Sequence, residues 1–217
     1  MKPKYREIKQ KGLMLTALGI FLVEVVGIVG VNSLMGHGVH LAWTISRYVG
    51  LETWSAVVFA VLNLIVMLAM LYYLYGVGES WQMKRGFYIL VVAIVLALVG
   101  LSACPLGYFD MAGSVSLVSR IHEFCSRLMF VLMLILVLVV MMCRRATRTT
   151  QILAGVFICY GLVCAFGFLT RASWFIGGGL IFEAVYLLGF MGWCLGCQTK
   201  KALVGRNVII KQEKGEQ

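Results

Sequence analysis

Charged residues are scarce in this 217-residue chain: they make up 13% of it, against 61% for hydrophobic residues. An ordinary soluble domain carries about 25% charged residues, so the composition excludes that class. Motifs of several enzyme classes are missing too. The chain has no P-loop, no H-E-x-x-H or H-x-x-x-H pattern and no Ser-His-Asp set, and no lysine lies deep in an apolar stretch, where a retinal Schiff base would need one. We therefore expect no metal and no cofactor.

What the chain has instead is six long apolar stretches, and a helix of about 20 apolar residues crosses the hydrocarbon core of a bilayer. They cover residues 12–32, 54–77, 86–104, 122–143, 151–170 and 174–197. We predict an all-α fold: a polytopic integral membrane bundle of six transmembrane helices over residues 1–200, followed by a polar, basic cytoplasmic tail at 201–217. The first stretch follows five cations, as a signal peptide would. It lacks a small-residue cleavage site, so we expect a retained helix.

The positive charge indicates how these helices are oriented. Of the 19 Lys and Arg, all but Arg47, Arg120, Arg127 and Arg171 lie in the two tails or in the second and fourth gaps between the stretches. By the positive-inside rule, both ends of the chain are cytoplasmic, N-in and C-in. The tails then lie where anionic membrane lipids attract them, which makes lipids the expected partners and a nucleic acid an unlikely one. We expect a multi-pass protein of the bacterial plasma membrane.

Two carboxylates and one amide interrupt the apolar stretches at similar depth: Glu24 in the first, Asn63 in the second and Glu183 in the sixth. An ionisable group in a spanning helix costs roughly 2.5–3.5 kcal/mol on insertion scales and rarely faces lipid. We expect one shared interior cluster. It would bind a ligand, relay protons, or only join helices through hydrogen bonds.

The outer start of the fourth stretch is dense in polar residues, which helical spacing divides into two stripes. One stripe holds Arg120, Glu123 and Arg127, and the other holds Ser119, His122 and Ser126. We predict that the stripe with His122 faces inward, because a neutral imidazole between hydroxyls is cheaper to bury than charges. His122 lacks partners at a metal-binding spacing, so it is a structural histidine or an acid/base.

Two connections on the predicted outer side are long, at residues 33–53 and 105–121, and long ordered loops are often functional. Segment 39–49 has the composition of a short interfacial helix. Asp110, the only Asp in the chain, falls in the second connection. With His122 and the outer arginines, Arg120 among them, it would suit a phosphate-bearing or polar headgroup. Ordinary turn chemistry is the alternative for Asp110.

Cysteine and glycine placement adds two expectations. Cys104 and Cys125 both fall on the outer side, where oxidation is permitted, and are predicted to lie within disulfide range. The sixth stretch is rich in glycine and contains Gly192-x-x-x-Gly196, a spacing that permits close helix packing. It is the expected face for a homo-oligomer or a partner membrane protein, or it serves packing within the bundle.

Two short segments carry a resemblance to a known group. I-S-R-Y-V-G at residues 45–50, and C-P-L-G at 104–107 followed by R-I-H at 120–122, resemble segments of the Frag/DRAM/Sfk-like superfamily of six-helix membrane proteins. They also resemble its bacterial relatives of the domain of unknown function 998 type. Of the family's functional positions, the resemblance implies a match at His122 first and at Ser46 second. Arg47 stands where eukaryotic members have an acidic residue, so no carboxylate role passes to that position.

The resemblance implies a lipid-related role, since eukaryotic members are associated with lipid-anchor remodelling, lipid distribution and autophagy. Our first functional prediction is an integral membrane protein that binds a lipid or amphiphile in an outward-opening polar pocket, with a regulatory or lipid-handling role. The alternative is a membrane-embedded lipid-modifying enzyme that uses His122 as acid/base, oriented by Asp110 or Glu183. A small transporter or channel subunit comes third. The ligand-binding residues expected are Glu24, Asn63, His122, Glu183, Ser46, Arg47, Asp110 and Arg120.

Overall fold

A computed structural model describes residues 3–104, 117–142 and 146–197 of the chain. The regular elements in these ranges are α-helices and one π-helical turn, without a strand. In chain order they are α1 (Pro3–Asn32), η1 (Ser33–His37), α2 (Ile45–Val49), α3 (Thr53–Trp81), α4 (Arg85–Ala103), α5 (Leu117–Met141), α6 (Arg148–Leu169), α7 (Ser173–Gly177) and α8 (Gly179–Gly196).

Six of these helices are long and apolar enough to cross a membrane: α1 continued by η1, then α3, α4, α5, α6 and α8. The predicted all-α fold with six spanning helices is therefore confirmed, and the chain is a multi-pass membrane protein. Their bounds differ from the apolar stretches in two places. Helix α1 begins at Pro3, because Lys, Arg and Glu in the basic tail are good helix formers although they are not apolar. The sixth stretch is divided into α7 and α8 at Gly178.

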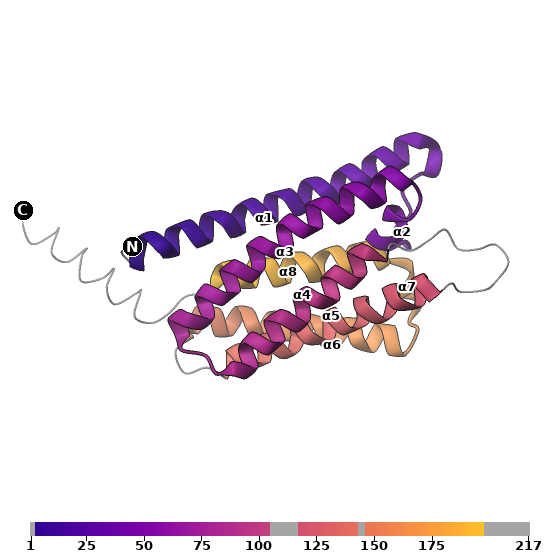
Figure 1. Cartoon of the computed structure of the whole chain (residues 1–217). Helices are drawn as coiled ribbons and strands as arrows, with labels where there is room; N and C mark the ends of the chain where they lie inside the picture. Colours follow the sequence, from indigo (N-terminus) through magenta and orange to yellow (C-terminus); the bar gives the residue numbers. More distant parts are fainter. Residues whose placement is uncertain (1–2, 105–116, 143–145, 198–217) are drawn as a thin grey trace, which may run out of the picture.

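The six long helices form a closed arrangement in chain order (Figure 1). Helix α1 packs against α3, α3 against α4, α4 against α5, α5 against α6 and α6 against α8, and α8 also contacts α1. Successive helices run in opposite directions. The start of α1 and the end of α8 therefore lie at one end of the bundle, and α2 and α7 lie at the other. From the charge distribution, we expect the first end to be cytoplasmic.

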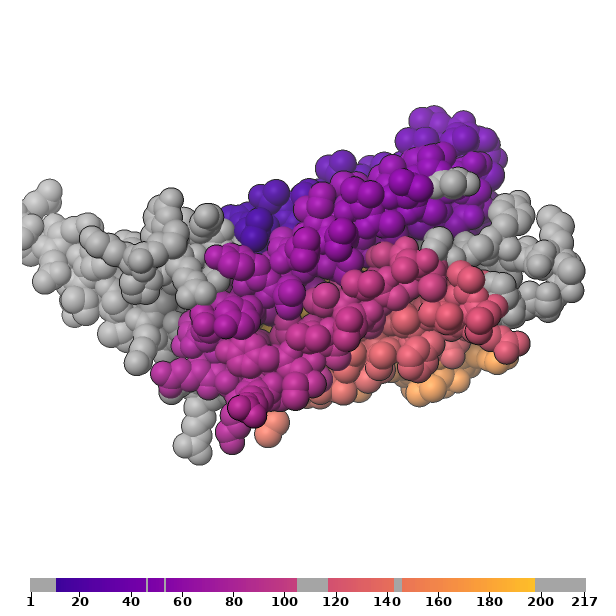
Figure 2. Space-filling model, viewed as in Figure 1, coloured from indigo at the N-terminus to yellow at the C-terminus, as the bar shows by residue number. Residues whose placement is uncertain are grey.

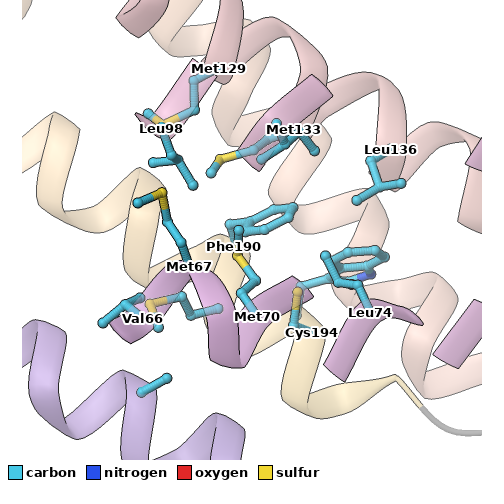
Figure 3. Packing of buried hydrophobic residues seen from close by; sticks show 14 of the residues in the cluster. Val66, Met67, Met70, Leu74, Leu98, Met129, Met133, Leu136, Phe190 and Cys194 are labelled. Carbon is cyan, nitrogen blue, oxygen red and sulfur yellow. The ribbon is translucent and has the colours of Figure 1, made fainter. Parts of the chain in front are cut away.

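Large apolar side chains from four helices fill the interior (Figure 3). Phe190 of α8 lies between Met67 and Met70 of α3 on one side and Met133 of α5 on the other. The outer surface of the long helices is apolar as well, with exposed residues such as Val61 and Phe166. Figure 2 shows one side of the bundle, with α1, α3, α4 and α5 at its surface. A bundle that is apolar both inside and outside is what a lipid environment requires.

Hydrogen bonds and glycines fix α8 among its neighbours. The Tyr73 hydroxyl of α3 donates to the Cys194 carbonyl at 2.6 Å, and the Tyr186 hydroxyl of α8 donates to the Phe130 carbonyl of α5 at 2.8 Å. Gly196 packs against Leu153 of α6, where a Cβ atom would be 2.4 Å from a Leu153 methyl carbon. Gly192 has open space around it, so the two glycines do not share one interface. Association with a partner through this helix stays a prediction.

We expect the connections at residues 78–85 and 144–150 to be inaccessible from outside the cell, because 15 of 19 cations fall on their side of the membrane. In a cysteine-free background, Lys84→Cys and Arg148→Cys should react with an impermeant maleimide only after the cells are permeabilised. Arg171→Cys, at the opposite end, is the control and should react in intact cells. Efficient labelling of position 84 in intact cells would reverse the orientation.

Candidate functional site

The interior of the bundle contains a cavity of about 50 Å³. All the long helices except α6 contribute to its wall, and Ile45 of α2 also lines it. Twelve of the 14 lining residues are apolar, and the two polar ones are Asn63 of α3 and Glu183 of α8. The apolar members are three phenylalanines, four methionines and five aliphatic residues: Phe21, Phe59, Phe190, Met70, Met129, Met133, Met191, Ile45, Val66, Leu98, Leu101 and Leu187.

Glu183 joins the cavity to the segment that covers the bundle. Its Oε2 accepts a hydrogen bond from the Ile45 amide, the first residue of α2, at 2.7 Å. The start of α8 approaches the same segment closely, since the Leu180 amide donates to the Leu41 carbonyl at 3.0 Å. A Cβ at Gly179 would be 3.0 Å from the Ala42 carbonyl oxygen, a spacing that favours glycine there. The carboxylate thus reaches both the cavity and the cover above it.

Asn63 lies on the cavity wall and also connects α3 to α4. Its Nδ2 donates to the Ser102 hydroxyl at 2.6 Å, and that hydroxyl donates to the Leu98 carbonyl at 2.9 Å. This chain fixes the amide side chain at the wall. Interhelical hydrogen bonding, which was one expectation for Asn63, is present together with exposure to the cavity.

Glu24 of α1 is buried, with 2% of its surface exposed, but it is not one of the lining residues. Neither carboxylate oxygen has a hydrogen-bond partner. The residue lies one helical turn from Phe21, which does line the cavity, on the same face of α1. Two of the three residues expected in one cluster therefore share the cavity, Asn63 and Glu183. The third, Glu24, lies next to the cavity wall.

His122 occupies a different place, between α4 and α5. Its Nδ1 is 2.7 Å from the Cys104 carbonyl oxygen, and because a carbonyl only accepts, Nδ1 carries the proton. Its Nε2 is buried without a partner. Ser119 is buried on the same stripe, whereas Glu123 is exposed. The inward orientation predicted for the histidine stripe is confirmed, but the structure does not bring His122 into the cavity.

The charged stripe of α5 faces outward, with Arg120, Glu123 and Arg127 all exposed. Arg127 Nη2 donates to Glu123 Oε2 at 2.9 Å, an ion pair one turn apart on the helix. Asp110 lies outside the described residues. The proposed headgroup site of Asp110, His122 and the outer arginines is therefore described only on its α5 side, where His122 is buried and Arg120 is exposed.

Residues 33–52 form a folded cap over the outer end of α1, α3 and α8. Asn32 Nδ2 contacts the Tyr48 carbonyl at 3.4 Å, and the Ser55 hydroxyl donates to the Val49 carbonyl at 2.9 Å. The Tyr48 hydroxyl accepts from the His40 amide at 2.6 Å. Ile45, Tyr48 and Val49 are buried, which places α2 inside the bundle end. The cap thus covers the cavity from the outer side.

The expectation of a helix over 39–49 is wrong for its first half, because α2 covers only Ile45–Val49. Gly36, inside η1, and Gly38, directly after it, adopt φ angles of 98° and 68°, which turn the chain at the end of η1 and suit glycine. A turn follows, in which the Trp43 amide donates to the His40 carbonyl at 3.0 Å. Two tight changes of direction within a few residues leave no length for a longer helix.

Of the residues named with the resemblance, Ser46 and Arg47 lie in this cap. Ser46 is in α2, and its side chain is outside the described part. The guanidinium of Arg47 lies 4.4 Å from the centre of the Trp43 ring, and that ring stacks on His40 at 4.1 Å between ring centres. Arg47 is exposed, so it belongs to the outer surface of the cap and not to the cavity.

Cys104 and Cys125 do not form a disulfide: both are free thiols. Cys104 ends α4, whereas Cys125 packs against Gly100, one turn deeper, where a Cβ would be 2.6 Å from its sulfur. The six cysteines that the structure describes are all free. The sequence places both thiols near the same end of the bundle, but it does not show that they lie at different depths along their helices.

Sequence reasoning missed the apolar wall of the cavity and the main-chain amide of Ile45. The available signal was methionine: the chain has 12, and Met129 and Met133 are four residues apart on one face of α5. Met70 and Met191 lie in other helices, and no spacing rule connects residues on separate helices. Their meeting depends on the packing order of the bundle.

Similarity to known proteins does not add to this description. Comparisons of the chain with family models, with curated proteins and with solved structures found no match. The resemblance to the Frag/DRAM/Sfk-like superfamily therefore stays a prediction that rests on two short segments.

Proposed function

We propose that this protein binds a lipid or another amphiphile in its interior cavity, in a regulatory or lipid-handling role in the bacterial plasma membrane. The observation that carries the proposal is the cavity itself, where Asn63 and Glu183 interrupt an otherwise apolar wall. Binding sites for small molecules have this composition: apolar side chains supply contact area, and a few polar groups set the orientation of the ligand. An amphiphile has both parts.

The size of the cavity requires the wall to move when a ligand enters. About 50 Å³ holds a few water molecules, whereas sites for drug-sized ligands have about 300–1,000 Å³. Four methionines line the space, and unbranched thioether side chains adapt to ligands of different shape. Ile45 belongs both to the wall and to the cap. Displacement of the cap would therefore open the cavity towards the outer leaflet.

The geometry supports binding better than the lipid-modifying enzyme considered above. A general base needs its partners within hydrogen-bond reach, and in the described residues His122 contacts a main-chain carbonyl instead of a carboxylate. A transporter needs a path to the cytoplasmic end. There the buried rings of Trp81 and Trp193 fill the bundle. Neither feature counts against a ligand held within the bundle.

Filling the cavity should weaken binding. Val66 lines it with 6% of its surface exposed, so we expect Val66→Phe to weaken the binding of palmitoyl lysophosphatidylcholine at least about tenfold. The reason is steric, because the added ring occupies the space of the ligand. Native mass spectrometry of the delipidated protein, titrated with this lipid, measures the bound fraction.

Val61→Phe is the matched control, since Val61 lies on the same helix but is 55% exposed on the outer surface. It should leave the bound fraction within about twofold of the unmodified chain. Equal binding by both variants would place the lipid on the outer surface of the bundle and reject the cavity as its site. Monodisperse elution of both variants confirms that they are folded.

A further inference from the structure

Helix α2 is attached to different helices at its two ends. At its start, the Ile45 amide donates to the Glu183 carboxylate of α8 at 2.7 Å. At its end, the Val49 carbonyl accepts from the Ser55 hydroxyl of α3 at 2.9 Å, and the Tyr48 carbonyl is 3.4 Å from a side-chain amide of α1. Tyr48 and Val49 are also buried. The start of α2 is therefore held by α8, and its end is held by α1 and α3.

The residues that precede α2 are bound to α8 as well. The Leu180 amide donates to the Leu41 carbonyl at 3.0 Å, and a Cβ at Gly179 would be 3.0 Å from the Ala42 carbonyl oxygen. The cap is the stretch of chain between α1 and α3, so it is joined to those two helices covalently. Its attachment to α8, which lies far away in the sequence, consists of contacts that can break and re-form.

Little buried surface is lost when this part of the cap moves. Every residue from 39 to 44 is exposed except Trp43, which is half-buried. Segments with few buried contacts open at a lower free energy than the core of a protein. Gly38, which precedes them, has a φ of 68°, and glycine moves between both signs of φ without a steric cost. Residues 38–45 can therefore move while the end of α2 stays in place.

The cavity lies directly behind this attachment, because Ile45 and Glu183 both line it. Separation of these two residues opens the wall between α2 and α8. Opening on the opposite side would instead expose Tyr48 and Val49, which are almost completely buried against α1 and α3. The apolar cost of that movement favours the α8 side.

We infer that residues 38–45 form a lid that opens on its α8 side and pivots on the end of α2, and that the amphiphile enters the cavity between the lid and α8. The inference rests on the proposed function and adds the route by which a ligand reaches that site. In the closed state, the Ile45–Glu183 and Leu41–Leu180 hydrogen bonds hold the lid on α8.

A covalent bridge between the lid and α8 tests the route. Leu41 and Ile181 are suitable positions, because they are 50% and 49% exposed and Ile181 follows the residue whose amide binds Leu41. In a cysteine-free background, Leu41→Cys and Ile181→Cys are bridged with a short bismaleimide before lipid is added. The bridge should weaken binding of palmitoyl lysophosphatidylcholine at least about tenfold, because only the open fraction of the protein binds. Native mass spectrometry of the delipidated protein measures the bound fraction.

A second bridge controls for the reagent and for the loss of helix motion in general. Tyr75 of α3 and Tyr88 of α4 have ring centres 5.5 Å apart, at the end of the bundle opposite the lid. Bridged Tyr75→Cys and Tyr88→Cys should bind the lipid as the unmodified chain does. The unbridged Leu41→Cys and Ile181→Cys variant should do so as well.

Hydrogen exchange of the full chain in lipid nanodiscs, without added ligand, tests the lid separately. Gly179→Val places a branched side chain against the Ala42 carbonyl and should shift the lid towards its open state. Amides of residues 41–45 should then exchange at least about fivefold faster, because their exchange follows the open fraction. Gly177→Val is the matched control, since a Cβ at Gly177 meets no atom within 4 Å, and it should leave these rates unchanged.

The outcomes separate the lid from the proposed function. Equal lipid binding by the bridged and unbridged Leu41→Cys and Ile181→Cys variant would overturn the route and leave amphiphile binding intact. Unchanged exchange in Gly179→Val would likewise overturn the lid. Failure of the unmodified chain to bind the lipid would overturn the proposed function and the route together, while the exchange rates still decide whether the lid opens at α8.

Discussion

Phe190→Ala is expected to lower the free energy of unfolding by about 3–5 kcal/mol, the range for truncating a buried phenylalanine. Phe190 has none of its surface exposed, and it occupies the centre of the packed interior in Figure 3. Its ring centre lies 5.7 Å from that of Trp193 and 5.9 Å from that of Phe157. Removal of the ring leaves a void that these neighbours cannot fill without moving. Circular dichroism during titration with a denaturing detergent measures the change.

Phe166→Ala is the matched control, because Phe166 of α6 is 63% exposed on the outer surface. Its cost should stay below about 1 kcal/mol. Since Phe190 also lines the cavity, its truncation enlarges that space, and saturating benzene should restore part of the lost stability by binding the folded state. Costs that are equal for the two variants would show that the ring does not hold the bundle together.

The fold was predictable because one physical requirement dominates it. A segment that crosses hydrocarbon must be apolar and must satisfy its own backbone hydrogen bonds, so length and composition locate each helix. The same requirement says little about helix ends that lie in water. Helix α1 begins at Pro3, ahead of its apolar stretch, and the sixth stretch is interrupted at Gly178. These ends depend on local propensity and on glycine conformation instead.

The candidate site was less predictable, because depth along a helix does not fix the direction in which a residue points. Glu24, Asn63 and Glu183 were expected at similar depth, yet only Asn63 and Glu183 line the cavity. The packing order of the helices decides which face of α1 contacts which neighbour, and that order cannot be predicted from any single segment. His122 shows the same point, since its burial was predicted correctly and its partner, the Cys104 carbonyl, was not.

Glu24→Leu is expected to raise the free energy of unfolding by about 2 kcal/mol or more. An ionisable side chain in the middle of a spanning helix costs roughly 2.5–3.5 kcal/mol on insertion scales, and a leucine of similar size does not. Glu24 gains no hydrogen bond in exchange, since both of its oxygens are buried without a partner. Few buried polar residues are left unsatisfied without a functional reason, so a residue that destabilises the fold in this way points to a role in binding.

The prediction therefore has two parts that must move in opposite directions. Stability against a denaturing detergent should rise in Glu24→Leu, while binding of palmitoyl lysophosphatidylcholine should weaken, because a polar group next to the cavity wall at Phe21 is lost. Glu123→Leu is the control: it removes an exposed carboxylate whose pairing with Arg127 is worth about 0.3–0.5 kcal/mol, so stability should fall slightly and affinity should not change. A loss of stability in Glu24→Leu would mean that the carboxylate has a stabilising partner in the membrane. Its burial would then be structural.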